Sequence, residues 1–124
     1  MTKINLGKKE VVHFIGLGGI GMSGLAQIMK NMGFKVQGSD LNINKNTDNC
    51  RRAGIKFFQG HSKKNISNAT IIVRSSAIKK NNVELLEASI KGIPSFDRID
   101  MLSNIVALKK NIIITGSHGK TTTT

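Results

Sequence analysis

The chain has 124 residues, one cysteine and a net charge of +12 from 19 basic and 7 acidic side chains. This length suffices for one domain with a core, and no apolar stretch approaches the ~18 residues of a membrane span or resembles a secretory signal. Because the single Cys50 excludes an internal disulfide, we expect a reducing cytoplasm and a buried, unreactive thiol. The basic residues are spread in pairs, which favours a solvated surface over a nucleic-acid-binding face.

The first half of the chain alternates short apolar runs with helical segments. Residues 11–15 are predicted to form a buried strand, and residues 20–32 a helix whose apolar side chains recur at spacings of three and four. Residues 35–39 are predicted as a second strand. A short helix at residues 47–53 and a third strand at residues 55–58 complete this half.

The second half repeats this alternation. Residues 70–74 are predicted as a strand, residues 83–91 as a helix and residues 93–96 as a short strand. An aspartate N-cap begins a helix at residues 97–108, and the apolar residues 112–114 are predicted as a further strand. The positions of helix 83–91 expected to face the core are Val83, Leu85, Leu86 and Ile90.

Strands separated by helices predict right-handed βαβ units and therefore a parallel sheet. The expected fold class is α/β, with a Rossmann-like parallel sheet and flanking helices in residues 1–108. Residues 109–124 are expected to be the first strand and phosphate-binding loop of a second domain. The helix that should follow that loop is missing, so the second domain is expected to be truncated.

The first functional motif is the glycine loop at residues 16–21, which reads Gly-Leu-Gly-Gly-Ile-Gly at a strand-to-helix turn. It matches G-x-G-x-x-G, in which the glycines permit a tight turn and a close approach of the backbone to a pyrophosphate at the helix N-terminus. Asp40 closes the next strand, where a carboxylate can accept from ribose hydroxyls, and Ser39 could share that role. Ser23 could donate to a phosphate. The motif predicts binding of a dinucleotide or a nucleotide sugar.

Other residues follow strands at the same predicted edge of the sheet. His61 comes after the third strand, and Ser76 lies in a small-residue turn after the fourth. Both positions suit contact with a phosphate or a sugar, but both residues are also ordinary in turns. His13, inside the first strand, is expected to be structural.

A second loop follows the apolar residues 112–114. Residues 116–121 read Gly-Ser-His-Gly-Lys-Thr, which matches the end of the general phosphate-binding loop, although Ile114 stands where that loop has its first glycine. Lys120 is expected to reach the β- and γ-phosphates of ATP and Thr121 to bind Mg²⁺. These two residues are the catalytic candidates.

The two loops together resemble the Mur ligases of bacterial cell-wall synthesis. The shortened second loop is the usual form in that family, and its histidine resembles the branch that adds the first amino acid or recycles peptides. The extended first loop, the Gly-Ser-Asp at residues 38–40 and the Ser-Ser-Ala-Ile at residues 75–78 also resemble the branch that adds the first amino acid. The resemblance covers nearly the whole chain.

The resemblance implies specific contacts for these residues. Contacts to a UDP-sugar are implied for Gly18, Gly19, Ile20, Gly21, Met22, Ser23, Ser39, Asp40, His61 and Ser76, with Ser39 and Asp40 at the uridine end. Contacts to ATP are implied for Gly116, Ser117, His118, Gly119, Lys120, Thr121 and Thr122.

The resemblance also implies the reaction of the full-length protein. ATP and Mg²⁺ would activate the lactyl carboxylate of UDP-N-acetylmuramate as an acyl phosphate, which L-alanine then attacks. This chain would supply the UDP-binding domain, with no ligase activity and weak UDP-sugar binding alone. Two alternatives remain open: a nicotinamide-dependent oxidoreductase domain, which shares the first loop, and a basic nucleic-acid-binding module. The oligomeric state and the choice among L-alanine, glycine and serine are also open.

Overall fold

The structure, a computed structural model, describes residue 7 and residues 9–117, with side chains described as far as Lys109. The strands are β1 (Val11–Ile15), β2 (Lys35–Asp40), β3 (Lys56–Gln59), β4 (Ile71–Arg74) and β5 (Ser95–Asp97). The helices are α1 (Met22–Asn31), α2 (Lys45–Arg52), α3 (Val83–Lys91), α4 (Arg98–Ser117) and the short 3-10 helix η1 (Lys63–Ile66), which the sequence did not predict.

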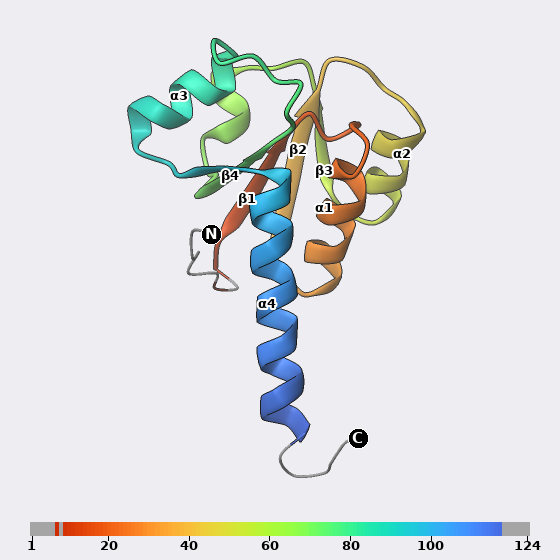
Figure 1. The fold of residues 1–124 in the computed structure, drawn as a ribbon. Helices are drawn as coiled ribbons and strands as arrows, with labels where there is room; N and C mark the ends of the chain where they lie inside the picture. Colours follow the sequence, from red (N-terminus) through yellow and green to blue (C-terminus); the bar gives the residue numbers. More distant parts are fainter. Residues whose placement is uncertain (1–6, 8, 118–124) are drawn as a thin grey trace.

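The five strands form one parallel sheet in the order β3-β2-β1-β4-β5. The chain winds outward from β1 through β2 to β3 and then crosses back to β4, on the other side of β1 (Figure 1). The direction of winding therefore reverses between β1 and β4, and the carboxyl ends of these two strands flank the crevice where open α/β sheets bind ligands. The predicted α/β class and parallel sheet are confirmed.

Two hydrophobic clusters cover the two faces of the sheet. The larger one joins β1, β2 and β4 to α1, α2 and the first half of α4, and includes Phe14, Met29 and Met101. The smaller one lies beneath α3 and η1 and includes Ile15 and Ile72. Cys50 belongs to the larger cluster, where burial raises the pKa of its thiol to about 11. This confirms the expected buried cysteine, because a protonated thiol is a poor nucleophile.

The last helix differs from the sequence prediction. Residues 112–114 were expected to form a strand, but α4 continues through them to Ser117. A strand needs a neighbouring strand to satisfy its backbone, and the described part of the chain places none there, whereas a helix satisfies its own N–H and C=O groups. Residues 118–124, with His118, Gly119, Lys120, Thr121 and Thr122, lie outside the described residues. None of the described helices is long and apolar enough to cross a bilayer.

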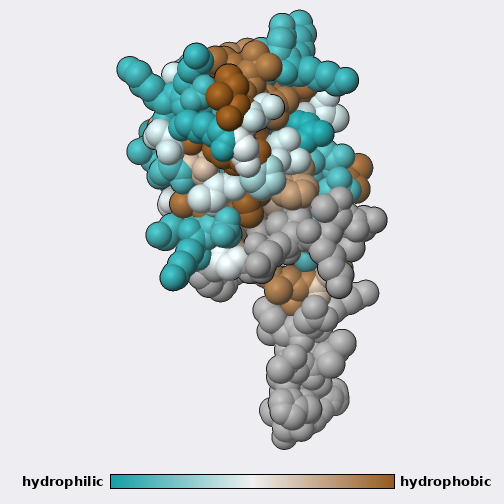
Figure 2. Space-filling view, turned by 90° about the vertical axis from the view of Figure 1, so that its left-hand side faces the viewer, coloured by the Kyte–Doolittle hydropathy of each residue, from teal (hydrophilic) through white to brown (hydrophobic). Residues whose placement is uncertain are grey.

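The buried face of α3 also differs from the prediction. Glu84 and Ala88 face the core, whereas Leu86 is 50% exposed and Ile90 is 78% exposed. Figure 2 shows hydrophobic surface among hydrophilic side chains on the side of the molecule that carries α3. The apolar pattern alone does not decide the orientation of this helix, because Glu84 forms buried hydrogen bonds that Leu86 and Ile90 cannot replace.

Close packing at the end of β2 generates a stability prediction. An alanine at Gly38 would place its Cβ 2.9 Å from the Phe14 carbonyl oxygen and 3.0 Å from the side chain of Leu17. Because the first of these atoms belongs to the backbone of β1, we expect Gly38→Ala to lower the free energy of unfolding by about 1–3 kcal/mol. Urea unfolding followed by circular dichroism measures this.

Gly24 in α1 is the matched control. A Cβ there meets nothing within 4 Å, so Gly24→Ala should stabilise the chain by roughly 0.5–1 kcal/mol through helix propensity. A Gly38→Ala variant as stable as the wild-type chain would contradict the close packing of β1 and β2.

Candidate functional site

The glycine loop between β1 and α1 is fastened to the end of β2. The backbone N–H groups of Gly16 and Leu17 both donate to the carbonyl oxygen of Ser39, at 2.9 and 3.0 Å. The N–H of Gly18 donates to Asp40 Oδ2 at 2.8 Å. The loop is thus held in place before any ligand arrives, which lowers the entropy cost of binding one.

Glycine is required at two corners of this loop. Gly16 has φ +91° and Gly21 has φ +79°, in the left-handed region that L side chains rarely adopt. At Gly18 the reason is space, because a Cβ would lie 2.8 Å from Asn44 Nδ2 and 3.0 Å from Asp40 Oδ2. The positive φ of Gly16 fits the tight turn predicted for the first glycine, whereas Gly18 makes room for Asn44 and Asp40, and Gly21 makes room for Arg98.

Some backbone donors of the loop and of the first turn of α1 remain available to a ligand. Gly18, Gly19 and Met22 use their N–H groups within the fold, toward Asp40, Gly16 and Gly19 respectively. The N–H groups of Ile20 and Gly21 have no acceptor among the described residues. They lie at the N-terminus of α1, where the helix dipole favours an anion. Of the six residues predicted for this loop, Ser23 also has a backbone N–H without an acceptor among the described residues, in the first turn of α1.

A cavity of about 330 Å³ lies beside the open donors, at the carboxyl ends of β1, β4 and β5. Its walls are Ile20, Met22, Ser75, Ser76, Asp97, Arg98 and Ile99. The cavity brings the predicted Ser76 next to the glycine loop, although the two are more than 50 residues apart in the sequence. It stands at the switch point of the sheet, the place where this architecture binds ligands.

Arg98 is a cavity residue that the sequence interpretation missed. Its side chain crosses the loop so closely that a Cβ on Gly21 would lie 3.0 Å from its Cδ and Nε. Within the described part of the chain, Arg98 has no hydrogen-bond or ion-pair partner. A guanidinium in this position can pair with phosphate oxygens through two parallel N–H donors. The only hint in the sequence was its place directly after the helix-capping Asp97, which the structure confirms as a cap for the N–H of Asp100.

Asp40 has a role that the sequence did not predict. Both of its carboxylate oxygens accept backbone hydrogens, Oδ2 from Gly18 at 2.8 Å and Oδ1 from Asn42 at 3.3 Å. Each oxygen keeps a lone pair that a ribose hydroxyl could use. Asp40 therefore holds the loop, and a contact with a sugar would come in addition.

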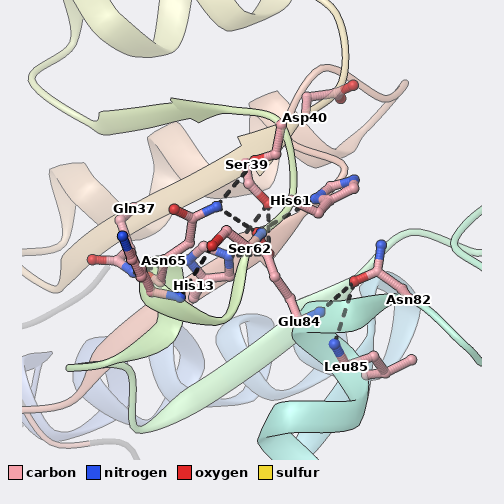
Figure 3. Close-up of polar contacts among 12 residues, drawn as sticks. His13, Gln37, Ser39, Asp40, His61, Ser62, Asn65, Asn82, Glu84 and Leu85 are labelled. Carbon is pink, nitrogen blue, oxygen red and sulfur yellow. Dashed lines mark hydrogen bonds and ion pairs between the residues drawn. The ribbon is translucent and has the colours of Figure 1, made fainter.

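Ser39 and His61 belong to a buried polar cluster on the opposite face of the sheet from α1 (Figure 3). Its centre is the carboxylate of Glu84, which is fully buried. Glu84 Oε1 accepts from His13 Nε2 at 2.7 Å and from Ser39 Oγ at 2.6 Å. Glu84 Oε2 accepts from Asn65 Nδ2 at 2.7 Å and from the backbone N–H of Ser62 at 3.1 Å.

These donors decide the charge of Glu84. Burial alone would raise the pKa of its carboxyl group, but the hydrogen bonds from His13, Ser39 and Asn65 outweigh burial and hold the pKa well below its ordinary value. Glu84 is therefore ionised at neutral pH. The sequence offered only a weak signal for this residue, an acidic side chain in the first turn after the N-cap Asn82.

His13 is structural, as predicted. Gln37 donates one amide hydrogen to His13 Nδ1 at 2.8 Å and the other to the carbonyl oxygen of Asn65 at 2.7 Å. With Nδ1 as an acceptor, the hydrogen of the uncharged ring lies on Nε2, where it donates to Glu84. Hydrogen bonds of buried polar side chains thus join β1, β2, η1 and α3.

Of the predicted ATP-binding residues, the structure describes only Gly116 and Ser117, and it places their backbone far from this site. Gly116 and Ser117 lie in the last turn of α4, and a helix of this length separates them from Arg98 by roughly 30 Å. Figure 1 shows α4 running away from the edge that carries the glycine loop. Among the described residues, no group of three or more His, Cys, Asp or Glu side chains could hold a metal ion.

The comparisons with known proteins agree with this geometry. A curated UDP-N-acetylmuramate–L-alanine ligase from Pelagibacter ubique is 62% identical over 122 residues, which are 98% of this chain and 26% of that protein. The chain spans about a quarter of the length of the curated relatives it matches.

Solved structures place the same fold in related enzymes. A UDP-N-acetylmuramate–alanine ligase from Thermotoga maritima matches with a TM-score of 0.76 and 29% identity, over 80% of this chain and 23% of that one. A UDP-N-acetylmuramate:L-alanyl-γ-D-glutamyl-meso-diaminopimelate ligase from Neisseria meningitides matches with a TM-score of 0.67 and 28% identity, over 76% and 30%. The family model described as "Mur ligase family, catalytic domain" matches residues 11–110, so this chain belongs to the Mur ligase family.

Proposed function

We propose that this chain is the UDP-sugar-binding domain of an ATP-dependent ligase that joins L-alanine to the lactyl carboxylate of UDP-N-acetylmuramate. The observation that carries the proposal is the convergence of unused donors on one cavity. The N–H groups of Ile20 and Gly21 and the guanidinium of Arg98 meet beside the helix N-terminus of α1. The relative with 62% identity has a name that states this substrate and this amino acid.

The diphosphate of the substrate would lie across the glycine loop. Its oxygens would accept from Ile20 and Gly21, while Arg98 would neutralise their charge from the opposite wall. Ser76 lines the same cavity and could donate to a phosphate or to the sugar. Gly18, Gly19 and Met22 would shape this cradle, because their N–H groups are used within the fold, and Ser23 would offer its N–H or its hydroxyl to a phosphate.

The nucleoside would extend toward the ends of β2 and β3. Asp40 lies at the end of β2, with its carboxylate beside Gly18, and His61 follows β3 on the same edge (Figure 3). Together they would receive the ribose and the uracil. The resemblance implied the uridine end for Ser39 and Asp40, and a contact to the UDP-sugar for His61.

The ATP half of the proposal rests on the sequence motif of residues 116–122. ATP would activate the lactyl carboxylate as an acyl phosphate and make it reactive toward the amine of L-alanine. Lys120 would bind the phosphates and Thr121 the Mg²⁺ that accompanies them. We infer that the chain alone binds the UDP-sugar weakly, catalyses no ligation and works in the cytoplasm, and that nucleic acid is not its partner.

The choice of nucleotide tests the proposed function against an oxidoreductase domain. In calorimetric titrations at moderate salt, we expect UDP-N-acetylmuramate and UDP to bind and NAD⁺ not to bind. Asp40→Ala should weaken UDP binding, because the variant loses the acceptor that holds Gly18. Selective binding of NAD⁺ would contradict the proposal, and binding that ignores uridine and collapses with salt would support a nucleic-acid-binding module.

Replacing Arg98 tests the position of the diphosphate. Loss of a charged hydrogen bond typically costs about 1.5–3 kcal/mol, so Arg98→Gln should weaken UDP binding by roughly 10- to 150-fold. Uridine, which has no phosphates, should bind the variant and the wild-type chain equally.

Arg52→Gln is the matched control for Arg98→Gln. Arg52 lies on the exposed surface of α2 and, among the residues that the structure describes, donates only to Asn49, at 2.8 Å, so its loss should leave UDP affinity unchanged. Equal effects of the two substitutions would show that general positive charge, and not the cavity, attracts the ligand.

A further inference from the structure

We propose that Glu84 is a positioning residue for the nucleoside half of the site. It acts through Ser39, which fixes the hydrogen of His61 on Nδ1 and leaves His61 Nε2 as an acceptor for an N–H or O–H group of the nucleoside. This inference rests on the proposed function for the identity of the ligand. The hydrogen bonds from which it is argued all lie within this chain.

The first step is the position of the single hydrogen of Ser39. Its hydroxyl lies 2.6 Å from Glu84 Oε1, and an ionised carboxylate can only accept. Ser39 therefore donates to Glu84. Its oxygen is then free only to accept, and its neighbour on the other side is His61 Nδ1, at 2.9 Å.

The second step follows for the ring of His61. Since Ser39 Oγ accepts, Nδ1 must carry a hydrogen, and Glu84 Oε2, at 3.5 Å from Nδ1, favours the same arrangement. The uncharged imidazole then has no hydrogen on Nε2. The state of this outer nitrogen is thus set by a carboxylate that the ligand cannot reach, because the side chain of Glu84 is fully buried.

The third step distinguishes His61 from the other members of the cluster. His13, Ser39, Asn65 and the backbone of Ser62 already supply four hydrogen bonds to the carboxylate at 3.1 Å or less. His61 is not needed to satisfy Glu84, and 11% of its side chain is exposed, whereas none of His13 is. Figure 3 shows the ring of His61 pointing away from Glu84, toward the end of the sheet where Asp40 lies.

The nucleoside of UDP offers two kinds of donor to such an acceptor. One is the imide N–H of uracil, and the other is a ribose hydroxyl. Cytosine has no hydrogen on the equivalent ring nitrogen, and 2′-deoxyuridine lacks one hydroxyl. CDP and 2′-deoxy-UDP therefore separate the two sources.

The test begins without ligand, on the full chain labelled with ¹⁵N. Long-range proton–nitrogen correlation spectra at about pH 8.5, where an ordinary imidazole is uncharged, report which ring nitrogen carries the hydrogen. We expect His61 to have it on Nδ1. In Ser39→Ala and in Glu84→Gln, we expect a mixture of both tautomers, because the arrangement that fixed Nδ1 is lost.

Glu87→Gln is the control on the same helix. Among the described residues, the polar partner of the Glu87 side chain is Lys91, at 3.9 Å, and not a member of the Glu84 cluster, so this substitution should leave the His61 tautomer unchanged. If Glu84→Gln does not fold, Ser39→Ala decides the question, because it removes one hydroxyl and leaves Glu84 with its other donors. A His61 hydrogen on Nε2 in the wild-type chain, or a tautomer unchanged in Ser39→Ala, would overturn the proposal.

Titrations of the same samples then identify the donor. We expect Ser39→Ala to weaken UDP binding about tenfold, the effect of one hydrogen bond. If the wild-type chain prefers UDP over CDP and Ser39→Ala loses that preference, the donor to His61 is the uracil imide. If the preference that is lost is for UDP over 2′-deoxy-UDP, the donor is the ribose hydroxyl. Unchanged UDP affinity in the variant would overturn the nucleoside role. Failure of the wild-type chain to bind UDP would overturn both the proposed function and the nucleoside role of His61. The tautomer measurement would still decide whether Glu84 positions His61.

Discussion

The carboxyl end of β2 is the constraint on which the rest of the site depends. The carbonyl oxygen of Ser39 receives two backbone hydrogens of the glycine loop, and its hydroxyl joins Glu84 to His61 on the other side of the sheet. The two neighbours of Ser39 in the sequence contribute as well. Gly38 has no side chain, which leaves space for Leu17 to pack against the sheet, and Asp40 accepts a hydrogen bond from the N–H of Gly18. Three consecutive residues therefore fix the loop that would receive the diphosphate and the histidine that would receive the nucleoside.

The two halves of the site are built on different physical principles. The diphosphate half uses backbone donors and one cation, Arg98, that has no partner in the described part of the chain, so its attraction is electrostatic and suits any anion of the right size. The nucleoside half uses a buried carboxylate whose hydrogen bonds hold neighbouring side chains in one orientation. Such a network can distinguish a donor from an acceptor on the ligand. Affinity and specificity would thus come from separate sets of residues.

The features that the sequence predicted well are those set by local rules. The glycine loop, the strand–helix alternation and the N-cap at Asp97 follow from backbone geometry and periodicity, and they were confirmed. Glu84 was missed because its burial depends on His13, Ser39 and Asn65, which are 19 to 71 residues away in the sequence. Arg98 was missed because only the order of strands in the sheet brings the start of α4 beside Gly21. The prediction of a strand at residues 112–114 was wrong. A strand needs a neighbouring strand for its backbone hydrogen bonds, whereas the helix α4 makes these bonds within itself.

The central claim is that UDP binds with its diphosphate at the N-terminus of α1. Backbone amide resonances, followed by nuclear magnetic resonance during a titration with UDP, test it directly. The account predicts large, saturable shifts for Ile20 and Gly21, the donors left open by the fold, and no shifts for Leu86 and Ile90 on the outer face of α3. Shifts centred on α3, with Ile20 and Gly21 unmoved, would contradict it.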